Sequence, residues 1–381
     1  MAESTGPLQG LRILELSGIG PGPFAATIFG DLGAEVVRVD RPGGSGTGLP
    51  ASFDILRRSR RSIVLDLRDP RGIGTLLDLV ESADVVIEGY RPGVAERLGI
   101  GPQDCMARNP KLVYGRMTGW GQDGPLAATA GHDLNYIAIT GALHAMGRSG
   151  EAPAIPLNLV GDFGGGAMYL VAGVLAALLE RERSGHGQVV DAGIVDGTAH
   201  MIGLFHGMMA AGQWQDRRGV NILDSGAPWY EVYETSDGQH MSVGAIEPAF
   251  YHQLMETLGL DPDPGRRADP GQWPAIRSDL ASAFAARTRQ EWTEIFEGSD
   301  ACVAPVLTLR EAPNHPHIQS REIFVEVDGV VQPAAAPRLS RTPGAVQSPP
   351  APVGAHTIEV LREWGINGAD DLIAGGVAVQ V

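Results

Sequence analysis

One aspartate, Asp162, stands directly before three glycines, in the segment Asn158-Leu-Val-Gly-Asp-Phe-Gly-Gly-Gly166. An apolar run without proline or charge follows from Ala167 to Leu179, which predicts a buried helix that begins near the glycines. Glycines in a first helical turn leave backbone N–H groups accessible, and the helix dipole adds partial positive charge there. Two interpretations follow. Asp162 is a catalytic carboxylate beside an oxyanion-stabilising turn, or it is an N-cap and the glycines permit close helix packing.

A histidine and a second carboxylate could work with Asp162 in proton transfer. His132, in Gly131-His-Asp133, opens a predicted helix, where the dipole favours the neutral imidazole of a general base. Glu247 follows a predicted strand and precedes Pro248, so by itself it is a carboxylate at a helix N-terminus. Together the three residues would supply one base, one acid and one orienting carboxylate. A purely structural role is the competing interpretation for His132.

Arginines gather in the first hundred residues and form a local basic region in an acidic chain. Four of them make up the cluster Arg57-Arg-Ser-Arg-Arg61, and others are Arg38, Arg41, Arg68, Arg91 and Arg97. Guanidinium groups can grip phosphates with two hydrogen bonds, so the cluster could bind a phosphorylated ligand. A solvated loop explains the same cluster equally well.

Two further patterns are weaker. Gly18-Ile-Gly-Pro-Gly-Pro23 after a strand, with Asp40 ending the next strand, partly matches a dinucleotide-binding fingerprint, but Pro23 replaces the third glycine. A tight strand-to-helix turn is the alternative. His315 and His317 lie in a proline-rich segment without a third ligand, so no metal site is predicted.

The composition is that of a globular enzyme. The chain has 381 residues, of which 43% are hydrophobic and 19% charged, and it is long enough for two domains. A net charge of −16 argues against a nucleic-acid partner and against an anionic membrane surface. Residues 1–6 lack the features of a signal peptide, and the apolar run near residue 170 is too short to cross a bilayer. We therefore expect a cytoplasmic protein with no nucleic-acid and no membrane partner.

The elements that must position these residues alternate in the first half of the chain. Strands are predicted at 11–16, 35–40, 62–67, 84–88 and 111–116, and helices at 24–32, 72–82 and 94–98. This alternation predicts the α/β class, with an open, mostly parallel, Rossmann-like sheet and right-handed crossovers.

The second half changes character. Helices are predicted at 132–145, 164–183 and 189–212, then a hairpin of strands 229–234 and 240–244, then helices at 248–258, 273–286 and 290–297. We expect a large domain over residues 1–224, a small α+β domain over 225–325, and a C-terminal segment, 326–381, that returns to the large domain. In that segment, 331–352 is expected to be extended, 356–364 helical and the last residues frayed.

Several motifs in this order resemble the family III CoA-transferase fold, and within it the α-methylacyl-CoA racemases. The resemblance runs from Leu11 to about Arg341. Its motifs are the segments 18–23, 31–38, 88–93, 118–122, 131–133, 161–166 and 243–248. In that family two chains interlock as a homodimer, and the active site lies between the large domain of one chain and the small domain of the other.

The resemblance implies a role for each matched position. His132, assisted by Glu247 from the second chain, would be one acid/base group, and Asp162 would be the other. The turn at Gly18 would serve the fold rather than a dinucleotide. Arg41 and Arg97 would face the CoA phosphates. Other positions implied to contact CoA are Leu65, Asp66, Leu67, Arg68, Gly89, Tyr90 and Arg91 along the nucleotide, and Gly131, Asp133, Leu134, Asn135 and Tyr136 along the pantetheine and thioester.

The implied reaction interconverts the R and S forms of a 2-methylacyl-CoA by removal and return of the α-proton through an enolate. Backbone N–H groups of Asp162–Gly166 are expected to stabilise the enolate oxygen. CoA enters as part of the substrate, and no other cofactor is implied. The alternative is CoA transfer between carboxylic acids through an anhydride at Asp162; His132 distinguishes the two, because the transferases typically lack a histidine there. Candidates for an apolar surface under the acyl chain, unless they are core residues, are Met201, Met208, Met209 and Met241.

Overall fold

The computed structural model describes residues 5–44 and 48–381, so Met1 to Ser4, on which the signal-peptide expectation partly rests, lie outside it. Contacts within the chain define two units. The first contains the described residues up to Thr140, Pro156–Met201 and Arg321–Val381, and the second contains Gly141–Ile155 and Ile202–Ser320. Residues 141–155 and 202–224, which the sequence analysis assigned to the large domain, therefore belong to the second unit.

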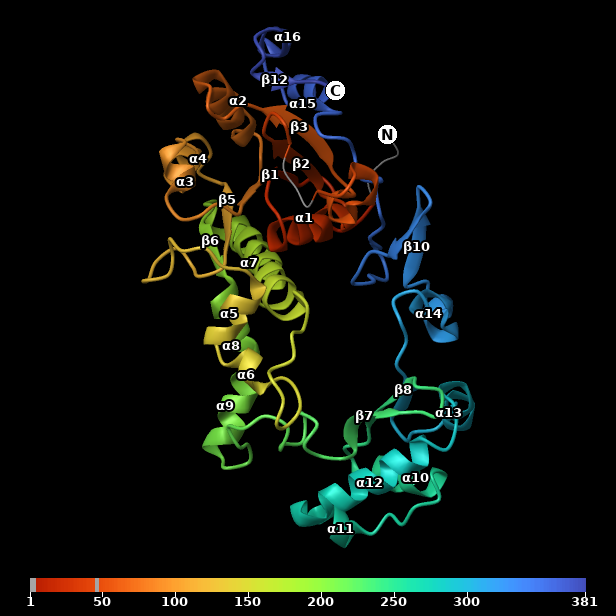
Figure 1. Ribbon diagram of the computed structural model, residues 1–381. Helices are drawn as coiled ribbons and strands as arrows, with labels where there is room; N and C mark the ends of the chain where they lie inside the picture. Colours follow the sequence, from red (N-terminus) through yellow and green to blue (C-terminus); the bar gives the residue numbers. More distant parts are fainter. Residues whose placement is uncertain (1–4, 45–47) are drawn as a thin grey trace. The chain divides into compact units, whose positions relative to one another are not determined.

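The first unit is built on a sheet that has seven strands within the described residues (Figure 1). Their order is β12-β3-β2-β1-β4-β5-β6, and all pairs are parallel except β12 with β3. The predicted α/β class with a mostly parallel sheet is thus confirmed. The strands are β1 (Arg12–Leu16), β2 (Glu35–Asp40), β3 (Arg61–Leu65), β4 (Val85–Glu88), β5 (Val113–Thr118), β6 (Val189–Gly193) and β12 (Ala378–Val379).

Alternation of side chains along each strand gives the sheet two buried faces. Leu14, Val37 and Ile63 belong to one core cluster, whereas Ile13, Val36 and Val85 belong to the other. Helices α2 (Pro70–Val80), α4 (Pro102–Arg108) and α15 (Thr357–Glu363) supply the first cluster, and α1 (Pro21–Asp31) and α7 (Met168–Ser184) supply the second. Further elements of this unit are η1 (Ala51–Phe53), η2 (Ile55–Arg57), α3 (Val94–Arg97), α5 (Asp133–Ile139), α8 (Ile194–Met201), α16 (Ala369–Ala374) and the hairpin of β10 (Phe324–Val327) and β11 (Val330–Pro333).

Two sequence predictions about these elements are wrong. The segment 189–212, predicted as one helix, begins with β6, because its first residues pair with Tyr114–Thr118 of β5. The last residues, predicted to be frayed, form α16 and β12, and β12 pairs with Val64 and Leu65 of β3. Both errors concern short strands whose identity depends on a partner strand far away in the sequence.

The segment after Asn158 forms one long helix. Its first part, η3 (Leu159–Ala167), is π-helical and continues directly into α7. The combined helix of 26 residues is long and apolar enough to cross a membrane by length and composition alone, so the prediction that this run is too short is wrong. Core helices of soluble proteins meet the same criterion, and α7 buries Leu170, Val174 and Leu178 in the core of the first unit.

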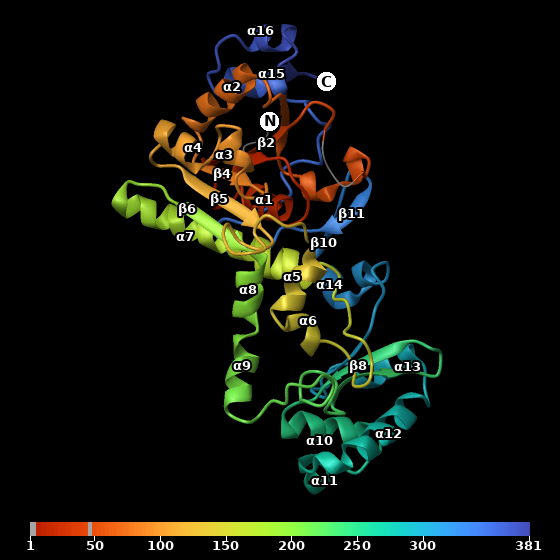
Figure 2. The same ribbon diagram turned by 60° about the vertical axis from the view of Figure 1, so that its left-hand side comes forward.

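The second unit contains the small antiparallel sheet β7 (Tyr230–Glu234), β8 (His240–Gly244) and β9 (Val303–Pro305). The predicted hairpin is confirmed by the pairing of Tyr230 with Gly244 and of Glu234 with His240. Figure 2 shows α10, α12 and α13 beside this sheet. The helices of this unit are α6 (Ala142–Ala145), α9 (Gly203–Ala210), α10 (Pro248–Thr257), α11 (Pro264–Ala268), α12 (Trp273–Phe284), α13 (Arg289–Phe296) and α14 (Pro316–Ser320), with η4 (Pro270–Gln272) and η5 (Ala312–Asn314).

Candidate active site

A hollow of about 670 Å³ opens at the carboxyl ends of β1, β4 and β5. The order of the strands reverses between β1 and β4, and this is the place where open α/β sheets bind ligands. Its walls include the turn 18–23 after β1, the turn 89–92 after β4, and the segment 117–120 at the end of β5. His132 and Asp162 both line this hollow, so the structure brings two of the predicted acid/base residues together.

Asp162 is held by its backbone and by its side chain. Its backbone N–H donates to Oδ2 of Asp133 at 2.6 Å, and its own Oδ2 accepts a hydrogen bond from Nδ2 of Asn158 at 3.3 Å. Gly20 faces the carboxylate: a Cβ at that position would lie 3.1 Å from Oδ2 of Asp162, and its φ of 72° also favours glycine. Asp162 therefore sits between the turn after β1 and the start of α5.

Burial raises the pKa of the Asp162 carboxyl above its ordinary value. The negative charge of Asp133 acts in the same direction, whereas the hydrogen bond from Asn158 and the charge of His132 favour the carboxylate and lower the pKa. The net shift is upward. A carboxyl group with a raised pKa in a ligand-sized hollow is suited to acid/base chemistry.

The prediction that the N–H groups of Asp162–Gly166 are free is wrong. The N–H of Asp162 is bound to Asp133, and that of Phe163 donates to the carbonyl of Asn158 at 3.2 Å. The rest of η3 continues the π-helical pattern, in which each N–H meets the carbonyl five residues before it. The N-cap interpretation of Asp162 is also wrong, because this residue lies inside η3.

The glycines that follow Asp162 allow close packing of η3 on its neighbours. A Cβ at Gly165 would lie 2.4 Å from Oγ1 of Thr198 in α8, and one at Gly166 would lie 3.0 Å from Cγ1 of Ile194. These distances are too short for a side chain. The packing interpretation of the glycines is thus confirmed. The helix that was expected to begin at these glycines begins earlier, at Leu159.

His132 is the N-cap residue of α5, and its side chain is exposed. Its backbone N–H donates to Oδ1 of Asn135 at 3.1 Å, which fixes the entry into the helix. The next two residues, Asp133 and Leu134, lie in the first turn, where backbone N–H groups have no acceptor within the helix. The hydroxyl of Tyr136 also stabilises the entry into the helix, because it donates to the carbonyl of Gly131.

A second hollow, of about 450 Å³, shares Ser17 and Tyr90 with the first. Predicted CoA contacts line both. Those in the second hollow are Arg41, Leu65, Asp66, Leu67, Arg68 and Tyr90, and those in the first are Gly89, Tyr90, Arg91, Gly131 and Tyr136. Arg97, Asp133, Leu134 and Asn135 are not among the lining residues of either hollow.

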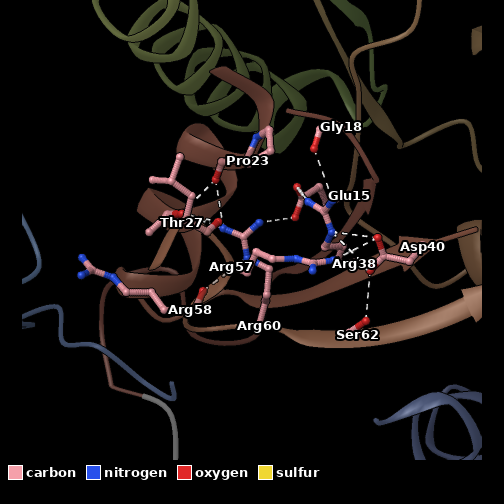
Figure 3. A network of polar contacts seen from close by, with 11 residues as sticks. Glu15, Gly18, Pro23, Thr27, Arg38, Asp40, Arg57, Arg58, Arg60 and Ser62 are labelled. Atoms are coloured by element: carbon pink, nitrogen blue, oxygen red, sulfur yellow. Dashed lines mark hydrogen bonds and ion pairs between the residues drawn. The ribbon is translucent and has the colours of Figure 1, made fainter. Parts of the chain in front are cut away.

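Both interpretations of the cluster Arg57–Arg61 are wrong, because the four guanidinium groups are buried and paired with carboxylates. Figure 3 shows part of this network. Arg57 pairs with Asp40 at 2.9 Å and Arg58 with Asp31 at 2.6 Å. Arg60 pairs with Glu15, and Arg61 with Glu35. The sequence feature that could have indicated these buried ion pairs is the presence of charged residues, such as Glu15, inside otherwise apolar strands.

The same network supports the wall of the first hollow (Figure 3). Arg38, which pairs with Glu15 at 2.7 Å, also donates to the carbonyl of Gly18 at 3.3 Å. Arg60 donates to the carbonyl of Pro23 at 2.9 Å and to the hydroxyl of Thr27 at 2.6 Å. The two arginines thereby hold both ends of the turn that faces Asp162.

Glu247 and the methionines complete the predicted set. Glu247 lies in the second unit, where it is the exposed N-cap residue of α10 directly after β8. Met241 is fully buried in the core of that unit, so for this residue the core interpretation is correct. Met201 is 40% exposed, and Met208 and Met209 are half-buried. Within residues 5–44 and 48–381, no group of three His, Cys, Asp or Glu side chains could hold a metal ion.

Asn158 is a lining residue to which the sequence analysis assigned no role. The predicted helix of 164–183 began after both Asn158 and Asp162, so the four-residue spacing that joins them in η3 was not recognised. Trp120 also lines the hollow, and its ring contacts Tyr136 edge to face at 4.7 Å between centroids.

Comparisons with known proteins agree with this architecture. CoA-transferase family III matches residues 8–357. The chain is 46% identical to alpha-methylacyl-CoA racemase from Mus musculus and 44% identical to that from Homo sapiens, in each case over 365 residues and 94% of both chains. Among solved structures, a CAIB/BAIF family protein from Brucella suis superposes with a TM-score of 0.81 at 26% identity, covering 94% of this chain and 100% of that one. By this match over most of its length, the chain belongs to CoA-transferase family III.

Proposed function

We propose that this protein is a racemase that interconverts R- and S-2-methylacyl-CoA thioesters by proton transfer at the carbon next to the thioester. The observation that carries the proposal is that His132 and Asp162 line one hollow, because the transferase chemistry needs only the aspartate. Racemisation requires one group to remove the α-proton and another to return a proton to the opposite face. The identity of 44–46% to relatives that bear the racemase name supports the same reaction.

The reaction needs more than a base. A gap of roughly ten pKa units between the base and the carbon acid corresponds to about 14 kcal/mol. General base catalysis contributes about 10²- to 10⁴-fold, so the enolate oxygen must be stabilised as well. Since the N–H groups of η3 are occupied, we propose that the N-terminus of α5, which His132 caps at the wall of the first hollow, supplies the donor.

The two acid/base residues have complementary properties. Asp162 has a raised pKa, which allows its carboxyl group to carry the proton that is returned to the substrate. His132 serves as its counterpart on the other side of the reacting carbon. In our proposal Glu247 from a second copy of the chain assists His132, so the active form is an interlocked homodimer with two composite sites.

The CoA part of the substrate is proposed to extend from the first hollow into the second. The exposed guanidinium groups of Arg41, Arg68 and Arg97 are available for its phosphates. Binding so far from the reacting carbon positions the thioester between the acid/base groups. CoA is then part of the substrate and no resident cofactor takes part; we place the enzyme in the cytoplasm.

The test is exchange of the α-proton with solvent. Incubation of S-2-methylacyl-CoA in D₂O should give deuterium at C2 together with loss of optical purity. The His132→Ala variant should bind the thioester but lose racemisation by about 10²- to 10⁴-fold. Retention of the original proton by the wild-type enzyme contradicts the racemase proposal, and unchanged turnover of His132→Ala removes this residue from the mechanism.

CoA transfer is the second candidate, and the half-buried carboxylate of Asp162 in a ligand-sized hollow favours it. In this reaction Asp162 attacks the thioester carbonyl, CoA leaves as a thiolate, and an acyl anhydride remains on the enzyme. The wild-type protein would then move CoA to an added free acid, and hydroxylamine would trap the acyl group at Asp162. Deuterium exchange at C2 without trapping decides for the racemase.

A further inference from the structure

We propose that Asp133 is a positioning residue whose carboxylate holds Asp162 and His132 in a fixed relative arrangement. The inference rests on the proposed function, because it concerns the two residues that exchange the proton. The resemblance implied that Asp133 contacts CoA, but its side chain is buried and turned toward η3. It does not line the first or the second hollow.

The geometry connects the two acid/base residues through one side chain. Asp133 follows His132 directly and is the first residue of α5. Its Oδ2 accepts the backbone N–H of Asp162 at 2.6 Å, across 29 residues of sequence. Movement of α5 relative to η3 would therefore break this hydrogen bond. The carboxylate of Asp133 is therefore a direct link between the two elements that carry the acid/base groups.

The surroundings of Asp133 are built around this contact. Only 5% of the residue is exposed, and its Oδ1 has no hydrogen-bonding partner among the described residues. A buried carboxylate with an unpaired oxygen is costly and is retained where it has a specific role. Its place in the first turn of α5 offsets part of that cost through the helix dipole.

Gly161 makes the close approach possible. A Cβ at this position would lie 2.5 Å from Oδ2 of Asp133 and 2.9 Å from Cγ2 of Ile137, both in α5. Any side chain there would push η3 away from α5 and weaken the hydrogen bond to Asp162. The absence of a side chain at Gly161 therefore leaves the room that the carboxylate of Asp133 occupies.

The same carboxylate acts on Asp162 through its charge. Three groups of α5 and its N-cap interact electrostatically with Asp162. His132 favours its charged form, and Asp133 disfavours it. The third is Tyr136, whose own pKa is raised by burial and then by the charge of Asp162. Removing the charge of Asp133 lowers the pKa of Asp162 from its raised value. For the enantiomer from which Asp162 removes the α-proton, activity on the acid side of the pH profile is then lost at a lower pH than in the wild type.

The test compares two substitutions at Asp133 in the full-length enzyme. Asp133→Ala removes the acceptor, and we expect kcat for deuterium exchange to fall about 10- to 100-fold with KM changed less than about twofold. Asp133→Asn keeps an oxygen that can accept the N–H of Asp162 but carries no charge. It should regain most of kcat while its acid-side pH limit shifts downward.

Asp84→Ala is the matched control. Oδ2 of Asp84 also accepts a backbone N–H, that of Arg12 at 2.9 Å, but at the amino ends of β1 and β4, away from the hollow at their carboxyl ends. This variant should keep the wild-type kcat. The proposal is overturned if Asp133→Ala keeps the wild-type kcat, or if Asp133→Asn neither regains kcat nor shifts the pH limit. If Asp133→Ala does not fold, Asp133→Asn decides by its pH limit.

Failure of the proposed function gives a different result. A wild-type enzyme that shows no exchange at C2 but forms a hydroxylamine-sensitive acyl group on Asp162 is a transferase. The positioning role of Asp133 is then measured on the rate of that acylation with the same three variants. A 10- to 100-fold loss in Asp133→Ala supports it, and an unchanged rate overturns it.

Discussion

The Asp162 carboxyl is subject to opposing influences from its nearest neighbours. Burial and the charge of Asp133 favour the protonated form, whereas the amide of Asn158 and the charge of His132 favour the carboxylate. The net effect is a pKa above the ordinary value, so the carboxylate accepts a proton more readily than that of an exposed aspartate. Each contribution comes from a different side chain, so each can be removed separately.

The Asn158→Ala substitution tests the contribution of the amide. Loss of the hydrogen bond of 3.3 Å removes a group that stabilises the carboxylate, so the pKa of Asp162 rises further. Activity on the acid side is then lost at a higher pH than in the wild type, the opposite direction to Asp133→Asn. The pH dependence of kcat/KM for deuterium exchange measures this. A shift in the same direction for both variants would contradict the assignment of the acid limb to Asp162.

At the scale of elements, two sets of contacts stabilise the segments that form the walls of the hollow. The helix η3 carries Asp162 and packs on α8 at Gly165 and Gly166, where a side chain would be crowded by α8. The turn after β1 is held at both ends by Arg38 and Arg60, which are themselves neutralised by Glu15 and Asp40. Glu15 and Ile194, which take part in these contacts, also line the hollow.

Gly165→Ala tests the packing of η3. The new methyl group would meet Oγ1 of Thr198 at 2.4 Å and its backbone nitrogen at 2.8 Å, so α8 or η3 must move. We expect a loss of about 1–3 kcal/mol in the free energy of unfolding, measured by urea denaturation, and a lower kcat. Gly74→Ala in α2 is the control, because no atom lies within 4 Å of its Cβ. It should be neutral or more stable by up to about 1 kcal/mol. Equal stability of both variants would rule out tight packing at Gly165.

Arg60→Leu tests the buried ion pairs. It removes one partner of Glu15, which is 1% exposed, and leaves a buried charge with incomplete compensation. The expected cost in the free energy of unfolding is about 3–5 kcal/mol. For comparison, Arg68→Leu breaks the ion pair with Asp66, in which the arginine side chain is 82% exposed, and should leave the free energy of unfolding nearly unchanged. Urea denaturation of the two variants measures the difference; similar values would show that burial does not strengthen the Arg60 pair.

At the scale of the whole molecule, the proposed catalytic residues belong to two units. His132 and Asp162 are in the first unit, and Glu247 is in the second. A site that combines Glu247 of one chain with His132 of another makes the activity a property of the dimer.

Coexpression of differently tagged His132→Ala and Glu247→Ala chains provides the test. If each site uses residues from two chains, a mixed dimer contains one site with both changes and one intact site. Random assembly gives half mixed dimers, so about a quarter of the wild-type activity returns. If Glu247 acts within its own chain, every site carries one change and no activity returns. Homodimers of each variant, purified separately, serve as controls and should be strongly impaired.

The sequence by itself determined the class of the fold and pointed to His132 and Asp162 as candidate acid/base residues. Alternating apolar patterns at 11–16, 35–40 and 84–88 define strands with two buried faces, since the periodicity is a local property. Asp162 was found because it stands directly before three glycines, and His132 because it opens a predicted helix. That both side chains line one hollow was decided by the tertiary structure, because no local pattern links the two segments.

Only the tertiary structure decided how those residues are supported. The pairing of Arg60 with Glu15 spans 45 residues and that of Asp133 with Asp162 spans 29, and neither leaves a local pattern. Arg57–Arg61 is a charged run that could equally face solvent, a phosphate or buried carboxylates, because the choice depends on what packs against it. The π-helical form of η3 and the strand β12 likewise depend on partners distant in the sequence, so composition and periodicity do not reveal them.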